Sequence, residues 1–289
     1  MEIAIISGKG GTGKSSISAA LATLSEKVVL ADCDVDAANQ YLLFNPSHEE
    51  EQVFIGGQKA VINPETCTNC GICVSYCRFD AISFSRQGVV ISETACDGCH
   101  LCMRICPHQA ISMVNSDKSR LYAGSFRNGR MVYGRLAPGE ENSGKLVNRV
   151  RDKAKEQARK HQLDTIIIDG PPGIGCPVIS SITGAHQLII VTEPSLSAML
   201  DLQRAADMSA NFHIQTHVII NKYDLDEDLS RQIESLCTET GIGMIGKIPF
   251  DPQVVEAMTH SKSITEWAPN SDTGKIITNI FQKLIHGKA

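Results

Sequence analysis

The chain has 289 residues and a net charge of −5 at pH 7, and 42% of its residues are hydrophobic, which is ordinary for a globular protein. This charge gives no electrostatic reason to expect nucleic-acid binding, which depends on clustered Lys and Arg. No apolar run approaches the roughly 20 residues that a membrane-spanning helix needs, and the start of the chain lacks the features of a signal peptide. We therefore expect a cytoplasmic protein of one large domain or two unequal ones.

A glycine-rich loop follows the first predicted strand, at residues 3–6, and precedes a predicted helix at 16–24. Between a strand and a helix, its G-x4-G-K-[ST] pattern is typical of a phosphate-binding loop. The glycines let backbone N–H groups point at the phosphates, and the lysine reaches the terminal ones. The loop consists of Gly8, Lys9, Gly10, Gly11, Thr12, Gly13, Lys14 and Ser15. We predict that Lys14 neutralises the β- and γ-phosphates and that Ser15 is a ligand of Mg2+.

A second apolar strand, at residues 27–31, runs into Asp32-Cys33-Asp34-Val35-Asp36. Its apolar run is continuous, as expected for a parallel sheet that is covered on both faces. Acidic residues just past the carboxyl end of a parallel strand lie where open α/β sheets bind their ligands. A solvated turn is the alternative for each of these aspartates. Asp34 is our candidate for orienting an attacking water.

Eight of the eleven cysteines lie in two copies of the spacing C-x2-C-x2-C-x3-C. This is the spacing of bacterial ferredoxins, in which three thiolates hold one 4Fe–4S cluster and the fourth reaches the other cluster. A zinc site is the alternative for one such run, but two copies, each followed by Ala-Ile-Ser, favour clusters. The predicted ligands of one cluster are Cys67, Cys70, Cys73 and Cys106, and those of the other are Cys96, Cys99, Cys102 and Cys77. Because sulfur fills every ligand position, we interpret His100 and His108 as surface residues.

Strands and helices alternate through the rest of the chain. First, Asn128-Gly129 between segments 121–127 and 130–136 predicts a hairpin, an antiparallel excursion from the main fold. The predicted strands that follow are 164–169, 187–192, 216–221 and 243–249, and the predicted helices are 142–161, 196–210, 226–240 and 272–286. This alternation predicts an α/β fold with a doubly wound, mostly parallel sheet. We expect a P-loop domain of residues 1–60 and 116–289, with an α+β ferredoxin-like domain inserted at 61–115.

Asp169 ends the predicted strand at 164–169, which is the position of a Walker B carboxylate that helps to hold Mg2+. Gly170-Pro171-Pro172-Gly173 follows and has the composition of a switch segment that senses the γ-phosphate. Further on, Asn221-Lys222-Tyr223-Asp224 matches the N-K-x-D pattern that recognises guanine. This match leaves GTP open as an alternative to ATP.

Four segments together resemble the MinD/Mrp-type ATPases with a deviant Walker A motif (SIMIBI), a group that includes the nitrogenase iron protein. They are G-K-G-G-T-G-K-S, D-C-D-V-D-A-A-N, I-I-D-G-P-P-G and N-K-Y-D, and with the cysteine runs they resemble members that carry an inserted 2x(4Fe–4S) ferredoxin domain. The resemblance implies that Lys9 crosses a dimer interface to the partner's nucleotide and that Asp34 and Asp169 lie in two switches. It also implies that the loop residues, together with Ser16, bind ATP and that Asn221 and the Pro249 region contact adenine.

Three cysteines lie outside the two runs. Cys176 lies seven residues past Asp169, where the resemblance to the nitrogenase iron protein would place a ligand of a bridging cluster. A bridging cluster needs a second cysteine from each subunit, and residues 136–144 contain none. We therefore interpret Cys176 as a small buried residue, and Cys33 and Cys237 as core cysteines.

We predict an ATPase with ATP, Mg2+ and two 4Fe–4S clusters, in which a nucleotide-driven dimer switch is coupled to electron transfer. The dimer would contain two identical chains or a paralogue, and the partner would be a protein electron donor or acceptor. The alternative is an ATP-dependent carrier or assembly factor that loads an iron–sulfur or other metal cofactor onto an apo-metalloprotein.

A membrane-cycling ATPase is a third hypothesis, based on an amphipathic stripe between Ile276 and Ile285. Packing in the core explains this stripe better, and too few lysines accompany it for a basic membrane face. We therefore expect no stable membrane association.

Overall fold

The computed structural model describes residues 1–127 and 129–287, and in this part of the chain the main body is built on a nine-stranded sheet. The strands across the sheet are β13 (Gly243–Ile248), β12 (Gln215–Asn221), β11 (Gln187–Thr192), β1 (Glu2–Ser7), β10 (Thr165–Pro172), β2 (Val28–Asp32), β9 (Gly129–Arg135), β8 (Ser119–Phe126) and β3 (Glu50–Phe54). All pairs from β13 to β9 are parallel, and β8 and β3 add an antiparallel edge. The predicted mostly parallel sheet is confirmed.

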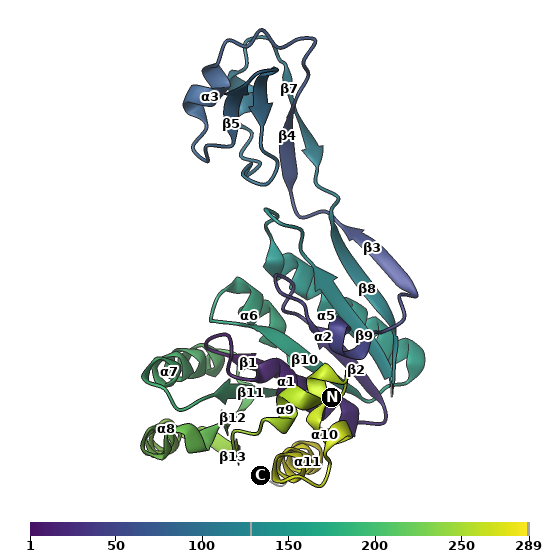
Figure 1. The fold of residues 1–289 in the computed structure, drawn as a ribbon, viewed down its shortest axis with the longest axis vertical. Helices are drawn as coiled ribbons and strands as arrows, with labels where there is room; N and C mark the ends of the chain where they lie inside the picture. The colour runs from purple at the N-terminus through teal and green to yellow at the C-terminus, as the bar shows by residue number, and fades with distance from the viewer. Residues whose placement is uncertain (128, 288–289) are drawn as a thin grey trace.

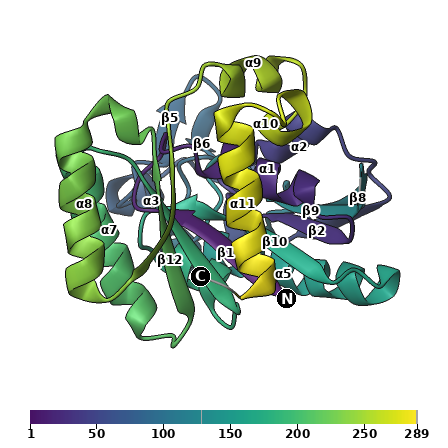
Figure 2. The ribbon, with the colours of Figure 1, turned by 90° about the horizontal axis from the view of Figure 1, so that it is seen from below.

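Helices cover both faces of this sheet. One face carries α5 (Ser143–His161), α6 (Cys176–Ile182), α7 (Leu196–Ala210) and α8 (Glu227–Thr240). The other face carries α1 (Lys14–Leu24), α2 (Gln40–Phe44), α10 (Ile264–Trp267) and α11 (Asp272–His286), with α9 (Gln253–Thr259) nearby and the short helix η1 (Tyr223–Leu225) after β12. Figure 2 shows α1, α10 and α11 gathered on that second face. Doubly wound topology is therefore confirmed as well.

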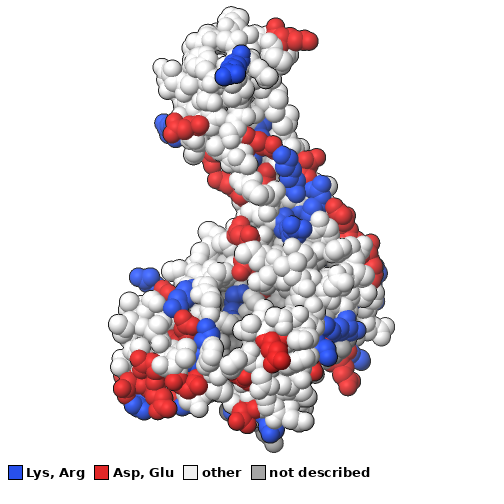
Figure 3. Space-filling view, viewed as in Figure 1, with Lys and Arg blue, Asp and Glu red and all other residues white. Residues whose placement is uncertain are grey.

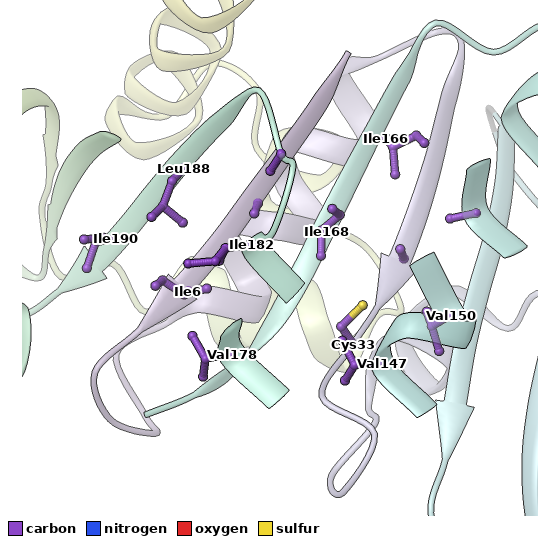
Figure 4. Packing of buried hydrophobic residues seen from close by; sticks show 14 of the residues in the cluster. Ile6, Cys33, Val147, Val150, Ile166, Ile168, Val178, Ile182, Leu188 and Ile190 are labelled. Carbon is purple, nitrogen blue, oxygen red and sulfur yellow. The ribbon is translucent and has the colours of Figure 1, made fainter. Parts of the chain in front are cut away.

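Two buried clusters hold these layers together. Because successive side chains of a strand point to opposite faces, Ile3 and Ile5 pack toward α1 and α11, whereas Ala4 and Ile6 pack toward the other layer. In Figure 4, Val147 and Val150 of α5 and Val178 and Ile182 of α6 lie over the strands. Cys33 lies in the same cluster, and burial raises the pKa of its thiol. Cys33 and Cys237 are both buried, as predicted.

The chain leaves the main sheet between β3 and β8. Strand β4 (Gln58–Ile62) pairs antiparallel with β7 (Ile111–Asn115), and β5 (Ile82–Ser85) pairs antiparallel with β6 (Gly88–Ile91). Helices α3 (Ile72–Tyr76) and α4 (Leu101–Ile105) each begin inside one cysteine run. We call residues 58–115 the cysteine module. Figure 1 shows it projecting from one end of the body, and most of its surface in Figure 3 is uncharged.

Two sequence predictions about strands are wrong in detail. The hairpin of β8 and β9 is not an excursion, because β9 joins the main sheet in parallel with β2. Gly129 permits this pairing, since a Cβ there would lie 2.0 Å from the carbonyl oxygen of Val28; its predicted turn partner Asn128 lies outside the described residues. Strand β10 also continues three residues beyond Asp169, because Pro172 pairs with Ser7 after a shift in register.

The apolar stripe of α11 is packed inside the body. Ile277, Ile280, Phe281 and Leu284 belong to the cluster on the α1 face. This packing confirms the core interpretation of the stripe. In the described part of the chain, no helix is both long enough and apolar enough to cross a membrane.

Candidate functional site

The glycine-rich loop joins β1 to α1 and closes tightly around its neighbours. Gly13 caps the N-terminus of α1 at φ +90°, in the left-handed region that favours glycine. A Cβ there would lie 2.3 Å from the amide nitrogen of Asn221, whose Nδ2 donates a 2.7 Å hydrogen bond to the carbonyl oxygen of Thr12. The fold thus fixes Asn221 directly against the loop.

Lys14 and Asp169 form a buried ion pair at the start of α1. Lys14 Nζ lies 2.7 Å from Asp169 Oδ1, and the side chains are 6% and 0% exposed. Burial by itself would lower the pKa of Lys14, but the Asp169 carboxylate outweighs burial, so the pKa is raised. Ser18 Oγ donates to Asp169 Oδ1 at 3.0 Å and Gln40 Nε2 donates to Oδ2 at 2.8 Å. The structure therefore brings the predicted phosphate lysine and the predicted Mg2+ carboxylate together.

A second buried carboxylate, Asp32, lies beside Asp169. The two residues are register partners on β2 and β10. Burial first, and then the charge of Asp169, raise the pKa of Asp32 to about 7. Asp32 Oδ2 accepts 3.1 Å hydrogen bonds from the backbone N–H groups of Asn39 and Gln40, which hold the end of the acidic segment against the sheet.

Asp34 is half-buried next to this pair. Burial is the first cause that raises its pKa, and the nearby Lys14 opposes this rise. Asp34 thus lies within electrostatic reach of Lys14, on a segment tied to Asp32 by the 3.2 Å bond from its own N–H to Asp32 Oδ1.

A cavity of about 200 Å³ opens beside the loop. Its walls include Gly11, Gly13, Ser16, Asn221, Pro249, Phe250, Val254, Thr273 and Ile277. Asp224 Oδ1 accepts a 2.7 Å hydrogen bond from the N–H of Phe250 and so fixes the loop after Pro249. The structure therefore places Asn221 and Pro249 around one cavity that begins at the glycine-rich loop.

Lys9 is held within its own chain. Its Nζ lies 2.9 Å from Glu193 Oε1 and donates to Ser195 Oγ at 2.9 Å. Lys222 Nζ lies 3.1 Å from Glu193 Oε2 and also donates to the carbonyl oxygen of Gly11 at 2.9 Å. Burial would raise the pKa of Glu193, but its bonds to the two lysines lower it. Glu193 therefore anchors both lysines beside the loop.

The cysteines of the two runs line two cavities in the cysteine module. Cys67, Cys70, Cys73 and Cys106 line one small cavity of about 20 Å³. Cys73, Cys77, Cys96, Cys99 and Cys102 line the other, also of about 20 Å³. The fold thus carries the fourth cysteine of each run to the other run. His108 lines the first cavity and is exposed, whereas His100 is half-buried in the wall of the second. Among the described residues, no three His, Cys, Asp or Glu side chains are grouped to hold a single metal ion.

The sequence pattern of the CobQ/CobB/MinD/ParA nucleotide binding domain family matches residues 3–264. The chain belongs to this family. It is 34% identical to an uncharacterised protein of Methanocaldococcus jannaschii, over 98% of this chain and 96% of the relative. It is 23% identical to the iron-sulfur cluster carrier protein of Pyrococcus furiosus, over 99% of this chain and 85% of the relative. The structure of the cell division ATPase MinD of Pyrococcus furiosus shares the fold, with a TM-score of 0.59 at 17% identity, covering 99% of this chain and 98% of that chain.

The prediction that Cys176 is a buried residue is wrong. Cys176 is exposed at the first position of α6. The buried side of this helix carries Val178, Ser181 and Ile182. Since residues two apart on a helix face different directions, Cys176 points away from the core that Val178 joins.

Sequence reasoning missed Gln40 and Glu193 and gave Asp32 no role of its own. Gln40 Nε2 bonds both Asp169 and the carbonyl oxygen of Ser15, which it reaches at 2.8 Å. Glu193 follows β11 directly, so its place at the carboxyl end of a parallel strand could have marked it as a site residue. No spacing rule points to Gln40, because its contacts come from three separate segments.

Proposed function

We propose that this chain binds and hydrolyses Mg2+-ATP as part of a dimer switch, and that its cysteine module carries two 4Fe–4S clusters whose electron transfer the switch controls. The observation that most supports this proposal is that eight cysteines line two cavities of the same chain that contains the Lys14–Asp169 site. The domains of the proposal are residues 1–60 with 116–289 for ATP and 61–115 for the clusters.

Nucleotide binding would begin with an exchange of partners at Lys14. In the structure its ammonium is satisfied by Asp169 at 2.7 Å. A γ-phosphate offers a stronger set of charges, so Lys14 would turn to the phosphates and release Asp169 for the Mg2+ that Ser15 holds. Asp34 would orient the attacking water. MinD of Pyrococcus horikoshii, a structural neighbour at 17% identity, was solved in complex with Mg-ADP.

Adenine fits the base cavity better than guanine. Guanine recognition by N-K-x-D needs a carboxylate that faces the base, but the cavity wall does not include Asp224, whose Oδ1 accepts from the N–H of Phe250. The remaining walls near Pro249 are largely apolar. ATP is therefore the nucleotide we propose.

Dimer formation would free Lys9 from Glu193 so that it reaches the partner's nucleotide. The Lys9 side chain is 31% exposed, so its ammonium can leave Glu193 without the unfolding of any helix or strand. The partner would be an identical chain or a paralogue.

The cysteine cavities suit clusters by their donors and by their walls. Each cavity offers at least four thiols from two sequence-distant segments, with Cys73 in both walls, and the other wall residues include Ala60, Ala81, Ile82 and Met113 in one case. Thiolates in an apolar wall are the ligand set of 4Fe–4S clusters. Bound clusters would supply one-electron oxidation and reduction at low potential.

The test is an anaerobic redox titration of the reconstituted full chain, followed by EPR, with and without Mg-ATP. We expect about eight iron atoms per chain, four for each cluster, and midpoints that change when Mg-ATP is added. Lys14→Met should keep both clusters and lose the response to Mg-ATP, whereas Cys99→Ser should lose one cluster and keep ATP binding. Cluster midpoints that ignore Mg-ATP in the presence of a dimer would rule out the gating.

A second function is an ATP-dependent carrier of iron–sulfur or other metal cofactors, which the names of relatives favour. The relatives from Pyrococcus furiosus and, over 43% of this chain, from Saccharolobus solfataricus are called iron-sulfur cluster carrier proteins. A carrier should transfer iron and sulfide to an apo-ferredoxin after reconstitution, and faster with Mg-ATP. Retention of all the iron on the chain would exclude this alternative.

A further inference from the structure

Lys59 is a buried charge where the cysteine module meets the nucleotide-binding body. It lies on β4, and its residue is 6% exposed. Its ammonium donates a 2.7 Å hydrogen bond to the carbonyl oxygen of Cys96 and a 2.5 Å bond to that of Gly139. The other two buried lysines, Lys14 and Lys153, each pair with a carboxylate, at 2.7 and 2.5 Å. Among the described residues, Lys59 forms no such ion pair.

Carbonyl groups satisfy the hydrogen bonds of the buried Lys59 ammonium but not its charge. The exposed Glu141 lies within electrostatic reach of Lys59 without forming an ion pair with it, so a further negative group close to the ammonium would stabilise it. Cys96, whose carbonyl oxygen Lys59 binds, lines the cavity that also contains Asp97, Cys77, Cys99 and Cys102. Four thiolates around a cluster would add such negative charge to this cavity.

The other partner of Lys59 leads to the nucleotide site. Gly139 lies in the loop between β9 and α5, and a Cβ on it would come within 2.5 Å of the carbonyl oxygen of Thr94 in the module. Three residues before Gly139, the N–H of Leu136 donates a 2.9 Å hydrogen bond to the carbonyl oxygen of Val35. Val35 follows Asp34 directly. The loop therefore contacts both the module and the acidic segment.

The cavity of Cys67, Cys70, Cys73 and Cys106 has no equivalent contact. Among the described residues, the bonds at these cysteines come from neighbours within the module, such as that from the N–H of Ala110 to Cys106 Sγ at 3.3 Å. No Lys or Arg side chain of the described residues donates to their carbonyl groups. The two cavities thus differ in their surroundings.

We propose that Lys59 is a positioning residue that raises the potential of the cluster of Cys77, Cys96, Cys99 and Cys102 and links it to the nucleotide site through the Gly139 loop. The inference rests on the proposed function and adds an asymmetry to it. A positive charge beside a cluster favours its reduced, more negative state, so Lys59 opposes the effect of Asp97 in the cavity wall and makes this cluster easier to reduce than it would be without the lysine. Movement of the acidic segment on nucleotide binding would reach Lys59 through Leu136 and Gly139.

The experiment is an EPR redox titration of the full, reconstituted chain with and without Mg-ATP, comparing Lys59→Met with a matched control. Lys118→Met removes a lysine that is 59% exposed and pairs with Glu93. In Lys59→Met we expect one midpoint to shift to more negative potential and to lose its response to Mg-ATP, with the other midpoint unchanged. Lys118→Met should leave both midpoints as in the wild type, and Lys59→Arg should recover part of the shift.

A second variant separates the charge from the linkage. Gly139→Ala keeps the charge of Lys59 but disturbs the loop contact, because its Cβ would come within 2.5 Å of the carbonyl oxygen of Thr94, and this midpoint should lose its response to Mg-ATP. Loading of only one cluster by Lys59→Met would also support the role of Lys59, whereas loss of both clusters would refute its assignment to one cavity. Unchanged midpoints in Lys59→Met overturn the inference. If the wild type itself takes up no clusters, the proposed function fails instead.

Discussion

Asp32 should make the protein less stable as the pH rises. Its pKa is raised from 3.8 to about 7 in the folded chain, by burial and then by Asp169. Asp32 releases its proton near pH 4 in the unfolded chain but only near pH 7 in the folded chain. Between these values the folded state binds one proton more than the unfolded state, so the free energy of unfolding falls as the pH rises. At ~1.4 kcal/mol per pH unit, the upper limit of this cost is about 4 kcal/mol above pH 7.

Asp32→Asn removes the titration and therefore this slope. The difference in the free energy of unfolding between variant and wild type should move in favour of the variant by about 2.5 kcal/mol between pH 5 and 8. A constant offset is expected in addition, since an amide replaces one acceptor of the bonds from Asp34, Asn39 and Gln40.

Anaerobic denaturant unfolding at pH 5, 6, 7 and 8 measures the slope, which the constant offset does not affect. Asp207→Asn, at an exposed position of α7, is the matched control and should give a difference that does not vary with pH. Parallel stability curves for Asp32→Asn and wild type would show that Asp32 is ionised in the folded chain throughout this range, and would refute the reasoning.

Three further outcomes are expected. Leu146→Ala should lower the free energy of unfolding by about 2–5 kcal/mol, because this fully buried side chain of α5 leaves a cavity; a loss below 1 kcal/mol in denaturant unfolding would contradict its place in the core. Asp224→Ala should weaken ATP binding about fivefold by calorimetry, since one hydrogen bond to a loop is worth ~1 kcal/mol, and unchanged affinity would show that the loop after Pro249 holds without it. In the folded, reconstituted chain, an alkylating reagent should modify Cys176 and spare Cys33 and Cys237, and mass spectrometry that finds Cys176 unmodified would contradict its exposure.

Much of the body could be predicted because its strands are buried on both faces. Such strands appear as continuous apolar runs, and the strand at 187–192 was predicted with the bounds that the structure has. The helices at 196–210 and 272–286 were also predicted with the observed bounds. The resemblance to the MinD/Mrp-type ATPases implied that Asn221 and the Pro249 region belong to one site, and both line the cavity beside the glycine-rich loop, at the carboxyl ends of parallel strands.

The remaining features depend on contacts between distant segments or on the direction of one side chain. Nothing local indicates that β9 pairs with β2, since the decisive contact is the close approach of Gly129 to Val28. Gln40 joins Ser15 to Asp169 only because α2 returns to the loop. The exposure of Cys176 depends on the rotation of α6, a short helix that no periodic pattern predicted.

The edge of the main sheet bears on how the cysteine module can move. The chain enters the module from β3 and leaves it into β8, and these strands pair antiparallel from Glu50 with Ala123 to Phe54 with Ser119. Strand β8 in turn pairs from Arg120 to Phe126 with β9, which lies next to β2. Because both connections start from one ladder, a free swing of the module would have to break it. A nucleotide signal is therefore better carried by small shifts at the contacts of Lys59 and Gly139 than by a large rotation. On this argument Mg-ATP should leave the distance between the module and the body of the wild-type chain unchanged, which spin labels on each would measure, and a large change in that distance would contradict it.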